Sequence, residues 1–287
     1  MDYIDLHVHS TFSFLDACGL PSQLVDRASE LGRKGLAITD HGIVSSFIKL
    51  EKSCEEKNMK PIYGCEFYTV SDINERARDR THITCLAKNN CGYENLMKLV
   101  TESWKYGFYY KPRIDGKLLY KHHENLIILS GCYSSSLCRK YRDEDYKRAY
   151  EIAAEFKAIF GSDYYLEIHP LELTYEYNKF LNQVSLDLDI PLVMANDVHF
   201  VQKGYHHVQH LLHLIRGTSE DKSSVIETLY LLSDEEIEQI IAKFPGVEWL
   251  TAIGNTMEIF EKINVKIPTM KTIEYPENFT FEDSIKN

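Results

Sequence analysis

The chain has 287 residues, and its 44% hydrophobic and 26% charged content is typical of a soluble globular protein. Its 32 basic and 43 acidic residues give a net charge of −11, which argues against a broad basic face for nucleic acid but permits bound cations to supply positive charge locally. The sequence contains neither an apolar run of about 18 residues, which would predict a membrane span, nor a basic region followed by an apolar stretch, which would predict a secretory signal. The seven scattered cysteines indicate reduced thiols. We therefore expect a cytoplasmic protein.

Short apolar runs alternate with helical patterns through the first 200 residues. The apolar runs predict strands at 3–8, 36–39, 61–68, 82–87, 126–130, 164–168 and 192–195, and the helical patterns lie at 22–31, 45–57, 89–106, 144–160 and 174–188. Seven strand–helix units favour a parallel sheet closed into a distorted (β/α)7 barrel, with an open doubly wound sheet as the alternative. The absence of Gly-x-Gly-x-x-Gly and Walker motifs argues against nucleotide-cofactor folds.

The pattern changes after Phe200. Helices are predicted at 205–216, 234–244 and 249–263, with one strand at 228–232, and the stretch containing Pro268 and Pro276 has the composition of an irregular tail. We therefore predict a barrel domain at 1–202 followed by a small helical extension and tail at 203–287.

Potential metal ligands stand at or near the ends of most predicted strands. The carboxyl ends of barrel strands meet at one face of the molecule, where the active sites of such barrels lie. The candidates are His7, His9, Asp16, Asp40, His41, Glu66, His82 at the start of its strand, Cys132, Asp197 and His199.

Each candidate also has an ordinary structural interpretation. Cys132 alone is typical of a small buried thiol, Asp40 of a helix cap, and His82 of a core histidine. The combination is different, because imidazoles, carboxylates and a thiolate are the ligands of zinc, manganese or iron. The set as a whole predicts a site for several metal ions.

Seven segments resemble, in chain order, the polymerase and histidinol phosphatase (PHP) domain family. They are DLHVHSTFSFLDA, LAITDHG, KPIYGCEFY, HITCLAKNNCGYENLMKLV, GFYYKPRID, LIILSGC and IPLVMANDVHF. The resemblance is greatest to the branch at the N-terminus of bacterial DNA polymerase III α subunits. It is dense over residues 2–200 and weaker from there to about Pro268, a stretch that resembles the link toward a polymerase palm.

The resemblance implies a distorted seven-stranded barrel that holds three divalent ions, zinc, manganese or iron. Matched by motif, His7, His9, Glu66 and Asp197 would hold the first ion. Glu66 would bridge to a second ion bound by His82 and Cys132, and the third would be held by Asp16, His41 and His199. All nine positions carry competent ligands, as in the active members of the family.

The implied reaction is hydrolysis of a phosphate ester, because bound cations lower the pKa of water to about 7 in favourable zinc cases and neutralise phosphoryl oxygens. The leaving oxygen would take its proton from metal-bound water, Asp40 or His199. Lys111 and Arg113 are either phosphate-binding residues or a solvated loop pair. The aromatic run at 108–110 is interpreted as core, with stacking on a terminal base as the alternative.

Three functions agree with the sequence. The first is a 3′–5′ exonuclease that acts on single-stranded or 3′-terminal DNA as the proofreading partner of a replicative polymerase. The second is a phosphomonoesterase for a small molecule, and the third is a non-catalytic, metal-stabilised module that docks onto a polymerase or clamp. Because no paired-aspartate palm motif is present, we expect no DNA polymerisation by this chain alone. Either the protein acts alone, or a separate polymerase chain is its partner.

Overall fold

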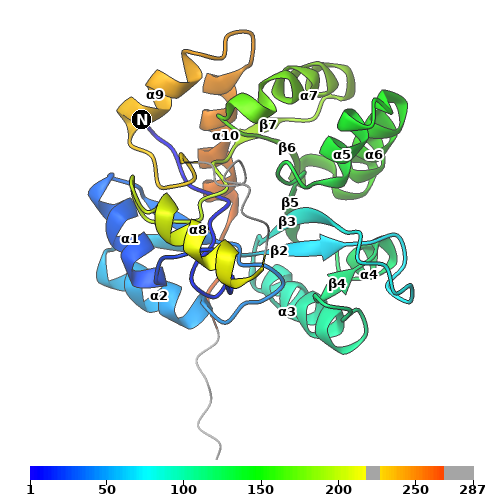
Figure 1. The fold of residues 1–287 in the computed structure, drawn as a ribbon, viewed down its shortest axis with the longest axis horizontal. Helices are drawn as coiled ribbons and strands as arrows, with labels where there is room; N and C mark the ends of the chain where they lie inside the picture. The colour runs from blue at the N-terminus through cyan, green and yellow to red at the C-terminus, as the bar shows by residue number, and fades with distance from the viewer. Residues whose placement is uncertain (218–226, 268–287) are drawn as a thin grey trace, which may run out of the picture.

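A computed structural model describes residues 1–217 and 227–267, in which a curled seven-stranded sheet is surrounded by helices (Figure 1). The strand order is β1-β2-β3-β5-β6-β7, and β4 pairs with β2. The strands are β1 (Gly35–Ile38), β2 (Lys60–Thr69), β3 (Thr81–Ala87), β4 (Arg113–Ile114), β5 (Leu126–Leu129), β6 (Tyr164–Ile168) and β7 (Leu192–Met194).

The predicted wholly parallel sheet is wrong at β3, which runs antiparallel to both β2 and β5. The other strand pairs are parallel. The reason is the connection between β2 and β3, which contains no helix. Parallel neighbours need a crossover of a dozen or more residues, whereas a direct connection returns the chain antiparallel.

The N-terminal segment closes the sheet into a barrel. The predicted first strand at 3–8 is not a regular strand, since within it only Val8 forms a bridge, to Val198. On one side, the segment accepts hydrogen bonds from the β1 region, with Ala37 N donating to Asp5 O at 3.0 Å. On the other side, His9 N donates to Val198 O at 2.7 Å beyond β7. The two sheet edges are thereby joined, which confirms the predicted distorted barrel.

The five helices predicted in the first 200 residues are confirmed, and two short helices and β4 were not predicted. Asp115 and Ser135 cap the two short helices, with side chains that accept from the backbone N–H three residues on. The helices here are α1 (Pro21–Glu30), α2 (Phe47–Glu56), α3 (Asn90–Lys105), α4 (Gly116–Lys121), α5 (Ser136–Arg142), α6 (Tyr146–Phe160) and α7 (Tyr175–Leu188).

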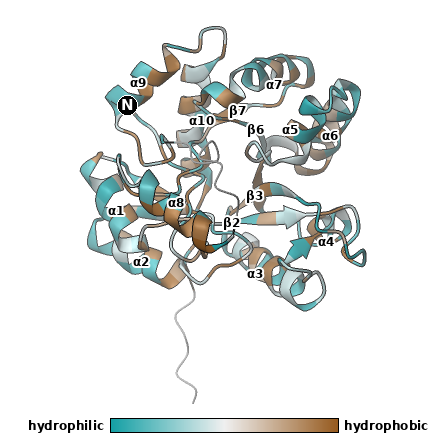
Figure 2. Cartoon of the chain, viewed as in Figure 1, coloured by the Kyte–Doolittle hydropathy of each residue, from teal (hydrophilic) through white to brown (hydrophobic). Residues whose placement is uncertain are grey.

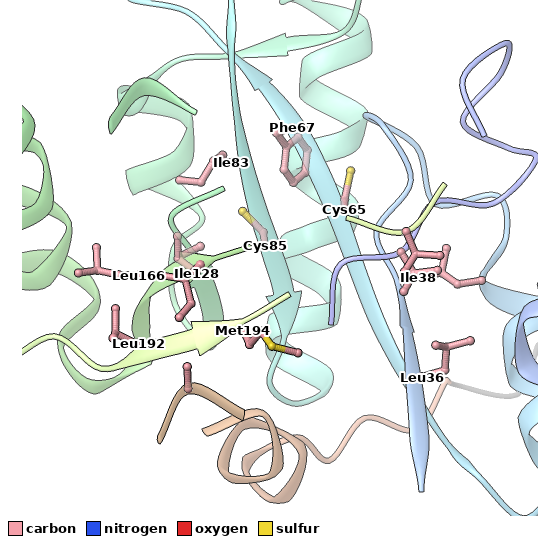
Figure 3. Packing of buried hydrophobic residues seen from close by; sticks show 14 of the residues in the cluster. Leu36, Ile38, Cys65, Phe67, Ile83, Cys85, Ile128, Leu166, Leu192 and Met194 are labelled. Carbon is pink, nitrogen blue, oxygen red and sulfur yellow. The ribbon is translucent and has the colours of Figure 1, made fainter. Parts of the chain in front are cut away.

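Strand residues alternate between two apolar layers. Ala37, Ile127 and Leu129 belong to the inner cluster, whereas their neighbours Leu36 and Ile128 belong to the cluster that packs under the outer helices. Figure 3 shows members of the outer cluster on β1, β2, β3, β5, β6 and β7. This alternation is what a closed sheet with a packed interior requires.

Three further helices follow the barrel strands: α8 (His206–Ile215), α9 (Asp234–Ile241) and α10 (Trp249–Lys262). Ile259 and Phe260 of α10 join the inner cluster, and Thr256 Oγ1 accepts from Ile4 N at 3.1 Å, so α10 seals the end of the barrel where the parallel strands begin. The strand predicted at 228–232 is reduced to a single bridge between Tyr230 and Phe200.

The predicted domain boundary near residue 202 stays a prediction, and the predicted tail beyond residue 267 lies outside the described residues. Among the described helices, none combines the length and the apolar character required to cross a membrane.

Candidate metal centre

All nine predicted metal ligands come together at the end of the barrel opposite α10. Glu66, near the carboxyl end of β2, is buried at their centre. His82 is at the start of β3, but β3 is antiparallel, so its start lies at the same end of the barrel as the carboxyl ends of the parallel strands. Reversal of this one strand explains how His82 joins ligands that follow their strands.

The first group consists of four side chains whose ligand atoms face one another. His7 Nε2 and His9 Nε2 are 3.2 Å apart. Glu66 Oε1 lies 3.5 Å from His7 Nε2, and Glu66 Oε2 lies 3.3 Å from His9 Nε2. Asp197 Oδ1 lies within 3.4 Å of both imidazole nitrogens. The two histidines project together because they are two residues apart in extended chain.

The second group shares Glu66 with the first. His82 Nδ1 lies 3.0 Å from Glu66 Oε1, and the Cys132 thiol donates to the same oxygen at 3.4 Å. Cys132 Sγ and His82 Nδ1 are 3.8 Å apart. Burial first, and the negative charge of Glu66 second, raise the pKa of Cys132 well above its ordinary value, so the thiol is protonated when no cation is bound.

The third group is centred on Asp16. His41 Nε2 lies 2.8 Å from Asp16 Oδ2, and His199 Nε2 lies 3.7 Å from the same oxygen. His41 Nδ1 also approaches Glu66 Oε2, at 2.7 Å. Glu66 therefore contacts all three groups.

Several ligand atoms fit a bound cation better than any partner that the protein gives them. Glu66 Oε2, Asp197 Oδ1 and His41 Nδ1 are buried, and none of the short contacts they make with one another or with the neighbouring imidazoles has the geometry of a hydrogen bond within the described residues. Buried polar atoms normally have partners, and carboxylate oxygens and imidazole nitrogens are ligands of transition metals. The residues present therefore fit metal ions.

In the metal centre, the pKa values of the carboxylates and of the imidazoles are shifted in opposite directions. Burial disfavours the charged form of Glu66, but the charges of His82, His41 and His7 outweigh this and hold its pKa well below the ordinary value. Burial likewise disfavours the His41 imidazolium, but Glu66 and Asp16 raise its pKa to about 10. Without cations, His7, His41 and His199, whose pKa values are all raised by the neighbouring carboxylates, therefore carry protons that balance the negative charge.

Glu167 and His169 at the end of β6 were missed by the sequence analysis. Glu167 Oε1 lies 2.6 Å from His7 Nδ1 and 3.3 Å from His169 Nε2, which fixes the His7 ring so that Nε2 faces the first group. The signal was present, because a glutamate inside the apolar strand YYLEI requires a buried partner.

A cavity of about 560 Å³ opens over the ligands, and four cations line it: Arg78, Arg80, Lys111 and Arg216. Arg216 follows α8 and donates to Asp16 Oδ1 at 2.7 Å. Burial and the charge of Arg216 lower the pKa of Lys111. Lys111 was predicted; the three arginines were missed, because Arg78 and Arg80 lie in an ordinary-looking charged loop and Arg216 lies in the predicted extension.

The structure places Arg113 and Asp40 outside this cavity. Arg113 is buried, and its guanidinium donates to the carbonyls of residues 73, 75, 77 and 107, each at 2.9 Å. It is therefore directed neither at the cavity, as a predicted phosphate-binding residue would be, nor at solvent, as a predicted surface-loop residue would be. Asp40 is also buried, and both its oxygens accept hydrogen bonds, from Ser10 and Ser13. It has no oxygen directed at the cavity for the predicted proton transfer.

The aromatic run at 108–110 is not the core element that we expected. Phe108 and Tyr110 are exposed, and Tyr110 lines the cavity. Tyr109 is half-buried, and the centre of its ring lies 5.4 Å from the guanidinium carbon of Arg113.

Together, the barrel and its buried imidazoles, carboxylates and thiol define a barrel protein with a cluster of groups able to bind metal ions. The family model of the PHP domain matches residues 5–170, more than half of the chain. The chain belongs to the PHP domain family, as the sequence motifs indicated.

Curated relatives match nearly the whole chain. The DNA polymerase III subunit alpha of Treponema pallidum is 34% identical over an alignment of 283 residues that covers 93% of this chain and 24% of the relative. The same subunit of Borreliella burgdorferi is 34% identical over 91% of this chain and 23% of the relative. For Aquifex aeolicus the values are 32%, 98% and 25%. The chain thus spans about a quarter of the length of these relatives.

Solved structures show a more distant likeness. A protein from Bifidobacterium adolescentis described as a candidate metal-dependent phosphoesterase has a TM-score of 0.46 and 16% identity, covering 86% of this chain and 97% of its own. An amidohydrolase from Chromobacterium violaceum has a TM-score of 0.46 and 12% identity, covering 69% of this chain and 88% of its own.

Proposed function

We propose that this protein is a metal-dependent phosphoesterase, and specifically a 3′–5′ exonuclease that removes nucleotides from DNA ends. The observation that carries the proposal is the convergence of nine ligand side chains, with Glu66 at their centre, beneath a rim of four cations. The cationic side chains at the mouth of the cavity would bind the phosphodiester of a substrate, and the carboxylates deeper in the cavity would hold the metal ions.

The three ligand groups would hold three ions, zinc, manganese or iron, and Glu66 contacts side chains of each group. When bound, such ions supply an activated water and neutralise charge on phosphoryl oxygens. No protein nucleophile is then required, and the thiol of Cys132, which lines the cavity, donates to Glu66 as a member of the ligand set.

The residues of the centre have separate roles in this proposal. Lys111 and Arg216 bind the phosphoryl oxygens at the rim. His199 Nδ1 lies 2.7 Å from the Asp197 carbonyl oxygen, which leaves Nε2 toward Asp16. We therefore assign His199 the role of a metal ligand and not the predicted role of proton donor. The leaving oxygen takes its proton from water in the cavity.

DNA is the favoured substrate because the relatives are DNA polymerase III α subunits. The proposed setting is cytoplasmic DNA replication, with a separate polymerase chain as the partner and proofreading as the task. In this setting the 3′ end of a single strand enters the cavity, and the rim holds its terminal phosphodiester.

The experiment compares three substrates with protein loaded with manganese or zinc. These are a single-stranded oligonucleotide labelled at its 5′ end, the same oligonucleotide labelled at its 3′ end, and p-nitrophenyl phosphate. Release of 3′-terminal mononucleotides, with a 5′-labelled ladder, supports the proposal. Turnover of p-nitrophenyl phosphate alone would indicate the phosphomonoesterase, and no turnover at full metal content would indicate the docking module.

A further inference from the structure

An exposed aromatic patch lies directly beside the cavity mouth. Trp104, Phe108 and Tyr110 are 47%, 52% and 57% exposed, although large aromatic side chains are usually well buried. The Trp104 and Phe108 rings stack with their centres 5.3 Å apart and an interplanar angle of 19°. Tyr110 lines the cavity, and the Arg78 guanidinium lies over its ring, 3.8 Å from the ring centre. We name these three residues the aromatic track.

Contacts connect the outer end of the track to the metal centre. Trp104 Nε1 donates to the carbonyl of Gly42 at 2.8 Å, and Gly42 directly follows His41. A Cβ built on Gly42 would come within 2.6 Å of Pro112, so this loop packs tightly against the residue that follows Lys111. The outer end of the track is therefore held by contacts to the two loops that carry His41 and Lys111, both of which line the cavity.

The backbone of the track is strained at its inner end. Tyr110 has a φ of 60° at the tip of a tight turn in which Tyr109 N donates to Lys111 O at 3.1 Å. A left-handed backbone is an outlier for a bulky residue, and such strain clusters where a side chain is held out for a ligand. Arg113 fixes this geometry, because it binds the carbonyl of Gly107 and, through the carbonyls at 73, 75 and 77, the loop that carries Arg78.

We infer that the aromatic track binds single-stranded DNA and leads its 3′ end into the cavity. This inference rests on the proposed function, because it places the nucleotides next to the reacting one. Bases stack on exposed aromatic rings without regard to sequence, and cations beside the rings hold the phosphates. The chain has a net charge of −11, but four cations gather at the rim of the cavity, which is where the 3′ end of such a strand would lie.

A small phosphomonoester would fit inside the cavity and would not reach Trp104 or Phe108. An exposed protein-docking patch would need neither the four cations nor the continuity with the catalytic mouth. The inference therefore predicts that affinity grows when a mononucleotide is lengthened to an oligonucleotide, and that the increase depends on the outer rings.

The chain offers a direct probe, since its two tryptophans differ in exposure. Trp104 is 47% exposed and Trp249 is 5% exposed. The intact, metal-loaded protein is titrated with a phosphorothioate oligothymidylate, which resists hydrolysis, and with thymidine monophosphate. We expect the oligonucleotide to change the emission of Trp104 and to bind at least about tenfold more tightly than the mononucleotide.

Variants separate stacking from general hydrophobic contact. Phe108→Leu and Trp104→Ala should each weaken oligonucleotide binding about tenfold, measured by anisotropy of a labelled strand, whereas Phe108→Tyr should retain it. Tyr106→Ala is the matched control, because Tyr106 is 58% exposed in the same segment but is not part of the ring stack. Thermal melts of each variant verify that the fold is intact.

The outcomes distinguish the track from the proposed function. Loss of affinity in the stacking variants supports the track, even in a protein that hydrolyses none of the substrates. Equal affinity of Phe108→Leu, Trp104→Ala and the wild type overturns the track, even where exonuclease activity is present. Absence of oligonucleotide binding by the wild type also overturns it and assigns the patch to a protein partner.

Discussion

Glu66 is the residue on which the ligand groups depend. Its side chain is buried, Oε1 faces His82 and Cys132, and Oε2 faces His9 and His41. A carboxylate that is desolvated and surrounded by imidazoles carries a full negative charge at low energetic cost only while those imidazoles or metal ions remain beside it.

Asp197 provides the sharpest test of the ligand assignment. Its Oδ1 lies within 3.4 Å of two imidazole nitrogens and makes no hydrogen bond within the described part of the chain. Asp197→Ala should lower hydrolysis by at least about 100-fold and reduce bound metal, measured by elemental analysis beside the activity assay. Asp26→Ala, an exposed carboxylate paired with Lys57, is the control. Full turnover in Asp197→Ala would show that the centre lies elsewhere.

Glu167 tests whether the orientation of a ligand matters as much as the ligand. Glu167→Gln keeps the size of the side chain but removes the charge 2.6 Å from His7 Nδ1. We expect metal affinity to fall about 10- to 100-fold, measured by competition with a chelator. An affinity equal to that of the wild type would mean that His7 is held by its packing alone.

At the scale of elements, the reversed strand β3 and the short strand β4 shape the site. Reversal of β3 brings His82 to the ligand end, and β4 carries Arg113 into the gap between two loops. One of those loops contains Arg78 and Arg80, and the other contains Tyr110 and Lys111. Arg113 thus acts on the cavity through the loops that it holds.

Arg113 and Lys111 should therefore respond differently to mutation. Arg113→Ala removes four hydrogen bonds donated by a buried guanidinium and should lower the free energy of unfolding on the order of 3 kcal/mol, measured by urea denaturation. Lys111→Ala should raise KM for the phosphate ester and change the free energy of unfolding by less than about 0.5 kcal/mol. A normal urea midpoint in Arg113→Ala would remove its proposed structural role.

At the scale of the molecule, the metal centre joins segments from most of the described chain. Its ligands extend from His7 to His199, and Arg216 of the α8 segment contacts Asp16. Figure 2 shows α8 hydrophilic at its beginning and hydrophobic toward its end. Binding of cations to such a centre stabilises the native state, because the unfolded chain cannot assemble it.

Removal of metal should therefore lower the melting temperature. Each ion present at about 100 times its dissociation constant contributes about 2.7 kcal/mol, which corresponds to roughly 5–10 °C per ion for a chain of this size. The measurement is a thermal melt before and after chelation, with re-addition of manganese or zinc as the control. An unchanged melting temperature would contradict a centre that couples so many segments.

The stability of the metal-free protein should be greatest within a limited range of pH. The positive charges of His7 and His169 outweigh burial and lower the pKa of Glu167 from 4.5 to about 2, so this stabilisation is complete above about pH 4.5 and is lost as the pH falls toward 2. The pKa of His41 is raised from 6.5 to about 10, so its contribution is complete below about pH 6.5 and is lost as the pH rises through 10.

Maximum stability of the chelated protein is thus expected between about pH 4.5 and 6.5, measured as melting temperature against pH. With metal bound, the gap between loaded and chelated protein should widen as the pH rises, because protons compete with the ions for the histidines. A melting temperature that climbs steadily above pH 6.5 without metal would contradict these protonation states.

The sequence by itself determined the barrel class, most element positions and ten candidate residues near the strand ends, because these depend on local periodicity and on residue types that follow strands; the resemblance to the PHP family then reduced the ten candidates to nine expected ligands. Only the tertiary structure decided the direction of β3, the burial of Arg113 and Asp40, and the exposure of Phe108 and Tyr110. It also brought Arg78, Arg80, Arg216 and Glu167 to the centre. The physical reason is that strand direction, burial and charge pairing depend on which segments meet in space, and local residue patterns do not encode those meetings.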